Sequence, residues 1–185
     1  MRKVLPCYFY NFRSCISLID CFDIFIQRSL GLNSRAQSWL SYKNSNTIKY
    51  LMSITPTGSV SFCSEGWGGR VSDKQVTIQS GFLNILETGD LILADRGFRI
   101  EQEVATKGAI LKVPAFTKGR SQLSAKEVNK SRQLANVRIH VERVIGRLKK
   151  FDILNVKLPI SQVDLLDNIV FTICGLVNMS NSVVV

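Results

Sequence analysis

The sequence predicts an α/β domain with a mixed five-stranded sheet flanked by helices, and three observations lead to that class. Short apolar runs bounded by turn residues or acids recur from residue 15 to residue 113, as strands do. Residues 124–151 carry the three- and four-residue spacing of a long amphipathic helix. The 185 residues, with 45% hydrophobic content, suffice for one ordinary core. We place the domain at residues 15–180, after a lead-in of residues 1–14 and before a tail of residues 181–185.

The first strand is predicted at residues 15–20, whose apolar run CISLID ends in Asp20. Ligands bind at the carboxyl ends of strands in an open α/β sheet, so Asp20 is a candidate site residue. A turn residue that caps the strand explains the same aspartate equally well. Asp23 follows closely as a second, weaker candidate. Residues 24–42 show no clear period and predict a loop or a broken helix.

A hairpin is predicted after that loop. Residues 47–55 read as a strand, and residues 59–64 alternate between apolar and polar side chains. The sequence PTG between them is typical of a tight turn. A connection this short requires the two strands to be antiparallel.

A glycine-rich loop and a helix follow the hairpin. Residues 65–70 (EGWGGR) could bring the chain close to a nucleic-acid backbone, or serve only as a flexible connection. The loop lacks the pattern of a nucleotide-binding P-loop. Ser72 and Asp73 can cap a helix, which we expect to continue to Leu86.

A second strand that ends in an acid repeats the arrangement of the first. Residues 91–94 (LILA) form an apolar run that stops at Asp95. We therefore expect two strands to deliver Asp20 and Asp95 to one edge of the sheet. Three further elements are expected after it: a short helix at residues 100–107, a fifth strand at residues 109–113 and a basic loop at residues 114–122.

The long helix carries the third candidate acid. Ser124 and Glu127 form a capping box at its start. Its apolar stripe consists of Leu134, Val137, Val141, Val144, Ile145 and Leu148. Glu142 lies about 100° round the helix from Val141, at the margin between core and solvent, where a carboxylate can face a cleft. The alternative is an exposed ion pair between Glu142 and Arg138, four residues earlier. Residues 159–178 are expected to form one more helix that packs on the sheet.

Positive charge is concentrated in one segment. The chain carries a formal net charge of +10, and residues 112–150 hold 11 Lys or Arg against two Glu, which is +9 of that total. Such a distribution predicts a face that binds a polyanion, although a solvated basic helix without that role remains the alternative. The candidate nucleic-acid-binding residues are Lys118, Arg120, Arg138, Arg143, Arg147, Lys149 and Lys150.

The cysteines and the apolar carboxyl-terminal segment indicate the redox compartment of the protein and whether it spans a membrane. Five cysteines without CxxC spacing indicate neither a disulfide framework nor a zinc knuckle, which favours a reducing compartment. Residues 163–185 are apolar but interrupted by Asp and Asn, so we expect no membrane span there.

The predicted element order is strand, strand, strand, helix, strand, helix, strand, helix, which is the order of a ribonuclease-H-like fold. In that fold Asp20, Asp95 and Glu142 could meet at one edge of the sheet. Close carboxylates repel one another unless a cation neutralises them. Hard divalent cations such as Mg²⁺ or Mn²⁺ suit an all-oxygen site. Two such ions about 4 Å apart could activate water and stabilise the leaving oxygen of a phosphodiester.

Several sequence stretches carry a resemblance to a known family. They are IDCFDIFIQ, SYKNSNTIKYLMSITPTGSVSF, GWGGRVSDK, LADRGF, and VPAFTKGRSQLSAKEV leading to RIHVERVIGRLKKF. Together they resemble the DDE superfamily endonuclease domain of Harbinger-like transposases. The resemblance implies a metal-binding triad of Asp20, Asp95 and Glu142, with Asp73 as an auxiliary acid. It also implies a DNA nuclease in the nucleus that cleaves transposon ends and, in active members, joins the 3′ hydroxyl to target DNA.

Other expectations concern activity and partners. The rival interpretation is a catalytically inactive, domesticated or truncated transposase relic that acts as a DNA- or protein-binding module; a related ribonuclease is a third class. Transposases of this type carry an amino-terminal DNA-binding region, and none is recognisable before Asp20, so a separate DNA-binding partner could supply recognition. A homo-oligomer and a cytoplasmic location stay open. His140 projects about 200° from Glu142 and is not expected to act as a general base.

Overall fold

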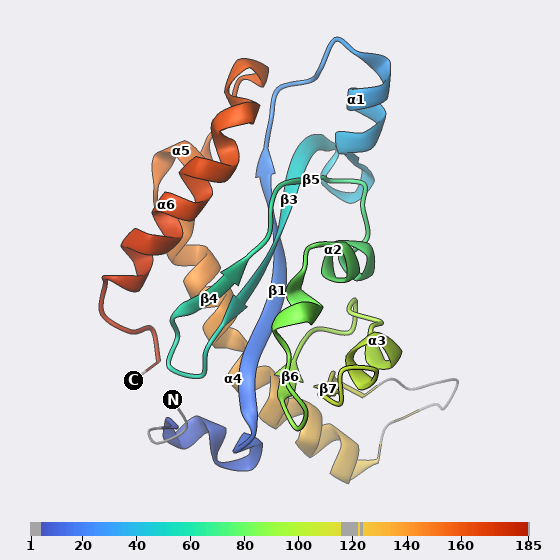
Figure 1. The fold of residues 1–185 in the computed structure, drawn as a ribbon, viewed down its shortest axis with the longest axis vertical. Helices are drawn as coiled ribbons and strands as arrows, with labels where there is room; N and C mark the ends of the chain where they lie inside the picture. The colour runs from blue at the N-terminus through green and yellow to red at the C-terminus, as the bar shows by residue number, and fades with distance from the viewer. Residues whose placement is uncertain (1–4, 116–121, 123, 185) are drawn as a thin grey trace.

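The computed structural model describes residues 5–115, 122 and 124–184. Its sheet is centred on β1 (Cys15–Phe25), which pairs antiparallel with β3 (Ser45–Ile54) and parallel with β6 (Leu91–Leu93). β6 in turn pairs parallel with β7 (Ile110–Lys112). The chain therefore forms a mixed α/β fold with a curled, mixed sheet (Figure 1), as the sequence predicts.

Three further strands pair with β3. β4 (Val60–Cys63) is its antiparallel neighbour and completes the expected hairpin. β2 (Trp39–Leu40) and β5 (Trp67–Gly68) are two-residue strands that pair with other stretches of β3. The described sheet thus has seven strands instead of the five expected. Two-residue strands are too short to show an alternating pattern, so the sequence could not predict them.

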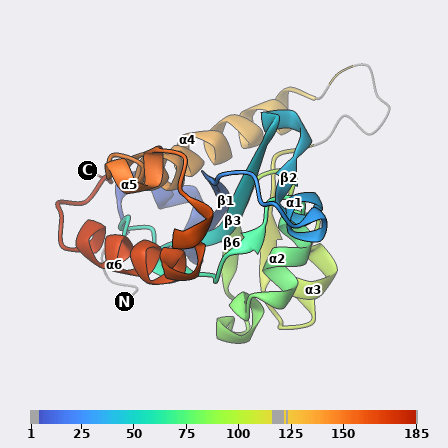
Figure 2. The ribbon, with the colours of Figure 1, turned by 90° about the horizontal axis from the view of Figure 1, so that it is seen from above.

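Helices cover both faces of the sheet (Figure 2). α4 (Ala125–Leu148) and α6 (Leu166–Asn178) lie on one face, and α2 (Asp73–Gln79) and α3 (Glu101–Ala105) lie on the other. Alternate residues of β1 serve the two sides: Leu18 packs in the core beneath α4 and α6, whereas Ile19 packs in the core beneath α2 and α3. Both side chains are fully buried, which contributes roughly 2 to 3 kcal/mol each.

The start and the buried stripe of α4 are confirmed. The Ser124 hydroxyl oxygen accepts a hydrogen bond from the Glu127 backbone N–H at 3.3 Å, and the Glu127 carboxylate accepts one from the Ser124 N–H at 2.9 Å. The buried residues of the helix include every member of the predicted stripe: Leu134, Val137, Val141, Val144, Ile145 and Leu148. The capping box and the apolar spacing were therefore sufficient to locate this helix.

Several predicted segments differ from the structure; among them, the first strand continues past Asp20 to Phe25, and the helix expected at residues 159–178 begins as a 3₁₀ helix before α6. The helix expected to continue to Leu86 ends with α2, because Gly81 adopts a left-handed φ of +83° before the 3₁₀ helix η3 (Phe82–Ile85). The stretch expected to be a loop or broken helix contains α1 (Leu32–Ser38). The remaining short elements are η1 (Cys7–Phe12), η2 (Ser41–Lys43), α5 (Asp152–Asn155) and η4 (Ile160–Leu165).

The carboxyl-terminal helix packs on the sheet. Its buried side chains are Leu166, Val170, Ile173, Cys174 and Val177. Asp167 on the same helix accepts hydrogen bonds from the Tyr50 hydroxyl at 2.6 Å and from the Gly66 N–H at 3.0 Å. By length and composition alone, Ile160–Asn178 could also cross a membrane, a test that core helices of soluble proteins pass as well. The five cysteines form no disulfide.

Candidate active site

Asp20 lies in the middle of β1 and not at its carboxyl end. The strand continues to Phe25 because it stays paired with β3 as far as Phe25 opposite Thr47. Pairing with β6, however, stops at Leu18 opposite Leu93, the last residue of β6. Asp20 therefore lies just past the point where the parallel part of the sheet ends, on the same face of β1 as Leu18.

Asp95 lies two residues beyond the end of β6. Its carboxylate accepts a hydrogen bond from the Arg96 N–H at 2.7 Å, and its carbonyl accepts one from the Phe98 N–H at 3.1 Å. The side chain is 51% exposed. The turn therefore holds Asp95 at the carboxyl edge of the parallel strands, where the sequence predicts it, with an oxygen open to solvent.

Arg138 links Asp95 to Glu142. Its guanidinium group is 3.1 Å from an Asp95 carboxylate oxygen and 3.7 Å from a Glu142 carboxylate oxygen. The arginine side chain is only 12% exposed, whereas that of Glu142 is 56% exposed. The ion pair that was the alternative explanation of Glu142 is therefore present. The same arginine also reaches the acid after β6, which the helix spacing could not show.

The electrostatics of Asp20 connect it to the other two acids. The pKa of Asp20 is raised to about 6, mainly by burial and to a smaller extent by the negative charges of Glu142 and Asp95. The positive charge of Arg138 and a hydrogen bond from the Cys21 N–H at 2.9 Å act in the opposite direction. The three predicted acids, from β1, the loop after β6 and α4, thus lie close enough to interact around one arginine.

A family model described as DDE superfamily endonuclease matches residues 19–178. The chain belongs to the DDE superfamily endonucleases. The matched range begins just before Asp20 and ends with α6, so it includes all three acids. Searches of curated proteins and of solved structures returned no match.

The donor atoms of this DDE endonuclease suit a divalent cation, but their arrangement around Arg138 is not a closed metal site. Carboxylate oxygens are the ligands that Mg²⁺ and Mn²⁺ prefer. Within residues 5–115, 122 and 124–184, no group of three or more His, Cys, Asp or Glu is gathered closely enough to hold a metal ion. Arg138 supplies positive charge to the acids in this arrangement. A metal ion would have to compete with that arginine.

Asp73, predicted as an auxiliary acid, lies on the opposite face of the sheet from Asp20. It forms an ion pair with Lys49 at 2.8 Å, and the Lys49 ammonium also donates to the Val71 carbonyl at 2.7 Å. Lys49 lies on the side of β3 that packs toward α2 and is only 7% exposed. Asp73 also lies beside Gly97, where an added Cβ would be 3.3 Å from its carboxylate. The ion pair of Asp73 with Lys49 therefore ties α2 to the sheet, and the Asp73 carboxylate lies next to the loop that carries Asp95.

Asp23 has protein partners of its own. It is 4% exposed and accepts hydrogen bonds from the Lys43 ammonium at 2.8 Å and the Tyr42 hydroxyl at 3.3 Å. These contacts hold η2 against β1 and leave little of this carboxylate for a ligand.

The predicted basic residues are divided among different environments. Lys118 and Arg120 lie outside the described residues. Arg143 and Lys150 are exposed, whereas Arg147 donates to the Asn181 carbonyl. Burial and the charge of Lys43 lower the pKa of Lys149, while Asp23 and Asp20 act against that shift. Lys149 therefore belongs to the surroundings of the acidic site.

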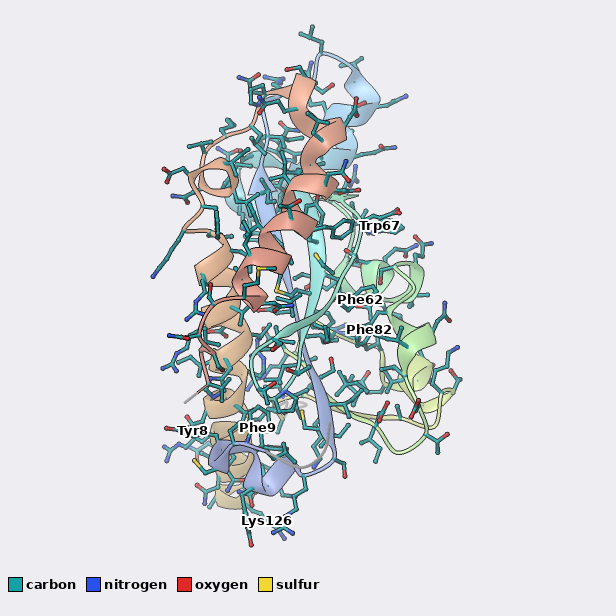
Figure 3. The ribbon with its side chains drawn as sticks, turned by 60° about the vertical axis from the view of Figure 1, so that its left-hand side comes forward. Tyr8, Phe9, Phe62, Trp67, Phe82 and Lys126 are labelled. Carbon is teal, nitrogen blue, oxygen red and sulfur yellow. The ribbon has the colours of Figure 1, made fainter. Side chains whose placement is uncertain are left out.

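His140 faces away from the acids, as expected. It is 3% exposed and packs against Tyr8 and Phe9, with ring centroids 5.7 and 6.1 Å away. Figure 3 shows both aromatic residues on η1, next to α4. Burial and the nearby Arg143 lower the pKa of His140. Its position fits a core residue and not a general base.

Two features of the candidate site could not be predicted from the sequence. One is the bridging position of Arg138, which depends on the approach of α4 to the loop after β6. The other is the pair of Lys49 and Asp73. A lysine inside an otherwise apolar strand was the available signal, because a buried ammonium group requires a carboxylate or carbonyl partner.

Proposed function

We propose that this domain is a divalent-metal-dependent DNA endonuclease of transposase origin, with Asp20, Asp95 and Glu142 as its metal-binding acids. The observation that carries the proposal is the convergence of these acids from three elements around Arg138. Membership of the DDE superfamily endonucleases supports nuclease chemistry. The stretches LADRGF and RIHVERVIGR support a Harbinger-like transposase as the origin.

The topology supports a ribonuclease-H-like fold. With the two-residue strands set aside, the strands lie in the spatial order β4, β3, β1, β6, β7. In chain order these are the third, second, first, fourth and fifth strands. Only the second strand, β3, runs against the other four. This arrangement brings the first strand, the end of the fourth and the helix after the fifth to one place, as the predicted triad requires.

The chain's own residues would prepare the site. Asp20 is fixed by the paired backbone of β1, and Asp95 is fixed by its turn. Arg138 limits the repulsion among the carboxylates, so they can remain close without another cation. A bound Mg²⁺ or Mn²⁺, held by the three acids, would supply activation of water and stabilisation of the leaving oxygen. The exposed Arg143 and Lys150 would contact DNA phosphates.

The substrate, a second reaction and the cellular compartment are part of the same proposal. DNA is the substrate, strand transfer to target DNA is a second reaction of the same acids, and the nucleus is the compartment. Recognition of particular sequences would come from another DNA-binding region or a partner protein. The basic outer side of α4 supports non-specific contact with phosphates.

The decisive test compares the wild type with Asp95→Asn. We expect the variant to lose more than about 100-fold of its metal-dependent cleavage of plasmid DNA, since even an outer-shell partner of a metal ligand contributes 10- to 100-fold. Glu101→Gln is the matched control, because Glu101 is an exposed acid on α3, which lies on the opposite face of the sheet from α4 and Glu142. Circular dichroism would establish that both variants fold. Normal cleavage by folded Asp95→Asn would exclude the triad.

One observation favours a second candidate, an inactive DNA-binding module. Among the described residues no metal-holding group is assembled, and Arg138 provides the charge that a cation would provide. Calorimetry with Mg²⁺ and Mn²⁺ separates the two functions. Binding by the wild type that disappears in Asp95→Asn supports the nuclease. A folded wild type that binds DNA but neither metal supports the inactive module.

A further inference from the structure

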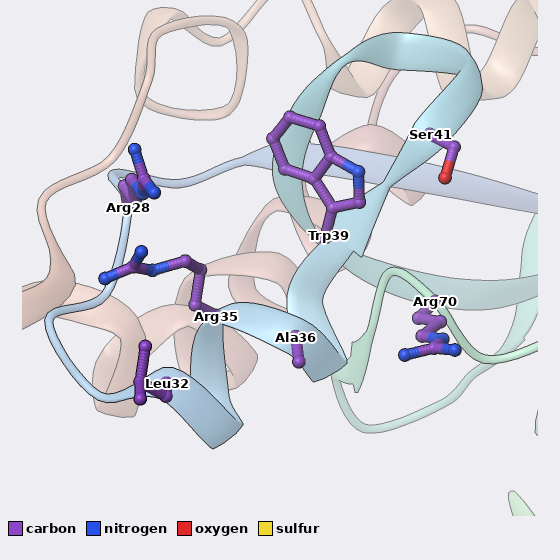
Figure 4. A pocket seen from close by; sticks show the side chains of 7 residues that line it. All are labelled: Arg28, Leu32, Arg35, Ala36, Trp39, Ser41 and Arg70. Carbon is purple, nitrogen blue, oxygen red and sulfur yellow. The ribbon is translucent and has the colours of Figure 1, made fainter.

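A pocket lies beyond the far end of β1, outside the acidic site. Its cavity is about 540 Å³ and is lined by Arg28, Leu32, Arg35, Ala36, Trp39, Ser41 and Arg70. Trp39 is 39% exposed, so an indole face is open to a ligand. Figure 4 shows Arg28 and Arg35 to one side of Trp39 and Arg70 to the other. The lining thus combines an aromatic surface with three cationic groups and contains no acid.

Close backbone contacts fix the Arg70 side of this pocket. A Cβ added at Gly68 would lie 2.6 Å from the Gln37 carbonyl oxygen, and one added at Gly69 would collide with the Thr47 hydroxyl. The Arg70 N–H donates to the same Gln37 carbonyl at 3.1 Å. The glycines of the EGWGGR loop therefore allow β5 to pack against the end of α1, and this packing places Arg70 at the pocket.

Buried polar contacts fix the opposite side. The Asn46 amide donates to the Arg35 carbonyl at 3.0 Å and to the Ser38 hydroxyl at 2.7 Å. Asn46 and Ser38 are 3% and 4% exposed. The Arg35 guanidinium donates to the Ser29 carbonyl at 3.3 Å and so holds the segment that carries Arg28. The pocket has preformed walls, which lowers the entropic cost of binding.

The three arginines carry charge that the described protein does not neutralise. Within the described parts of the chain, no carboxylate forms an ion pair with Arg28, Arg35 or Arg70, in contrast to Arg138. Unneutralised guanidinium groups on either side of an exposed indole are suited to a ligand that alternates phosphates with aromatic rings. Single-stranded nucleic acid has that chemistry, because cationic grooves follow its backbone while its bases stack on aromatic side chains.

We propose that this pocket binds an unpaired stretch of DNA, with one base stacked on Trp39 and the neighbouring phosphates on Arg28 and Arg35 and on Arg70. The proposal rests on the proposed function, because it takes DNA as the substrate. Base pairs within a duplex keep their faces stacked on one another, so they cannot use Trp39 in this way. The pocket would therefore hold a separated strand several nucleotides away from the cleaved bond.

The position of the pocket relative to Asp20 supports this role. Arg28 follows Asp20 by eight residues on or just beyond the same strand, a separation of roughly 25 Å at the rise of an extended chain. That span is about seven base pairs of duplex at 3.4 Å each. The bound nucleotide would thus lie several positions away from the phosphodiester at the acids.

The experiment measures binding of labelled oligothymidine and of a duplex of equal length, both in buffer with EDTA. We expect Trp39→Ala to weaken oligothymidine binding roughly 5- to 100-fold, the contribution of one stacked base, with little change for the duplex. Trp39→Phe should restore most of the affinity, since it keeps an aromatic face. Arg70→Ala should also weaken binding and reduce the slope of log K against log salt by about 0.7. Lys107→Ala, an exposed site with the same loss of charge, should leave binding unchanged.

Three outcomes would overturn the pocket proposal. They are a folded wild type that does not bind oligothymidine, a Trp39→Ala variant that binds it normally, and an equal loss for single strand and duplex in the Trp39 and Arg70 variants. The last result would indicate ordinary phosphate contacts with a duplex. EDTA removes metal ions and therefore prevents cleavage during the measurement. The binding test can thus succeed if the nuclease proposal fails, and the nuclease proposal can hold if the pocket does not bind oligothymidine.

Discussion

Arginine has opposite surroundings in the two regions of this molecule that matter for function. At the acidic site, Arg138 is largely buried and lies within ion-pair distance of two carboxylates. At the Trp39 pocket, Arg28, Arg35 and Arg70 have no carboxylate partner in the described chain. The comparison teaches that the net positive charge alone does not locate a polyanion. Unpaired arginines next to an aromatic ring indicate where the protein has charge left for a ligand.

Gly69→Ala should have the largest effect, because it disrupts the packing that places Arg70 at the Trp39 pocket. The added methyl group collides with Thr47 and lies 3.0 Å from the Ser38 carbonyl, so we expect a loss of about 2 to 4 kcal/mol in the free energy of unfolding. Urea titration measures it. Gly146→Ala on α4 is the control, because an added Cβ there has nothing within 4 Å, and it should stabilise by up to ~1 kcal/mol. Equal stability of the two variants would mean that the loop is not closely packed.

Asp20→Asn should have the second-largest effect, which is a change in how the free energy of unfolding depends on pH. The pKa of Asp20 is about 6 in the folded chain and near 3.8 in the absence of structure, so the folded state binds the proton more tightly. The stabilisation from this proton is present below about pH 4 and is lost as the pH rises through 6. In metal-free buffer at pH 7 the variant should therefore be more stable than the wild type, by up to about 3 kcal/mol. Urea titrations of both proteins at pH 4 and pH 7 check this. If the change in the free energy of unfolding between pH 4 and pH 7 is the same in the variant as in the wild type, the prediction is contradicted.

Arg138→Gln and Arg70→Gln should give the smallest effects and compare the two kinds of arginine directly. Loss of Arg138 leaves the acids to repel one another, which should cost about 1 kcal/mol of stability without metal and raise Mg²⁺ affinity roughly tenfold. Loss of Arg70 should change stability by less than about 0.5 kcal/mol and leave Mg²⁺ affinity unchanged. Urea titration and calorimetry provide the measurements. Weaker Mg²⁺ binding by folded Arg138→Gln would show that the arginine assists the metal instead of competing with it.

The sequence predicted those parts of the site that depend on local signals. The capping box and apolar stripe located α4, and the apolar run before Asp95 located the end of β6. The extent of β1 was missed because an acid normally ends a buried strand, whereas pairing with β3 carries this strand five residues past Asp20. Propensity is a weak guide where a long-range partner determines the outcome.

The pocket could not be predicted because its residues come from separate segments without a period. Arg28 follows β1, Trp39 begins β2, and Arg70 follows β5. Their proximity depends on the packing of Gly68 and Gly69 against Gln37 and Thr47. The sequence contained those glycines, but both a flexible connection and a close approach to nucleic acid were consistent with them. Only the three-dimensional contacts show that they serve close packing within the protein.

The continuity of β1 has a consequence for the length of DNA that the domain would engage. Each residue from Leu18 to Phe25 pairs with one residue of β3, without a bulge or a hinge between the acid and the end of the strand. Under both proposals, this strand connects the acid at the cleaved bond to the Arg28 side of the pocket that holds the nucleotide. The domain would then hold a nucleotide at a constant distance from the cut.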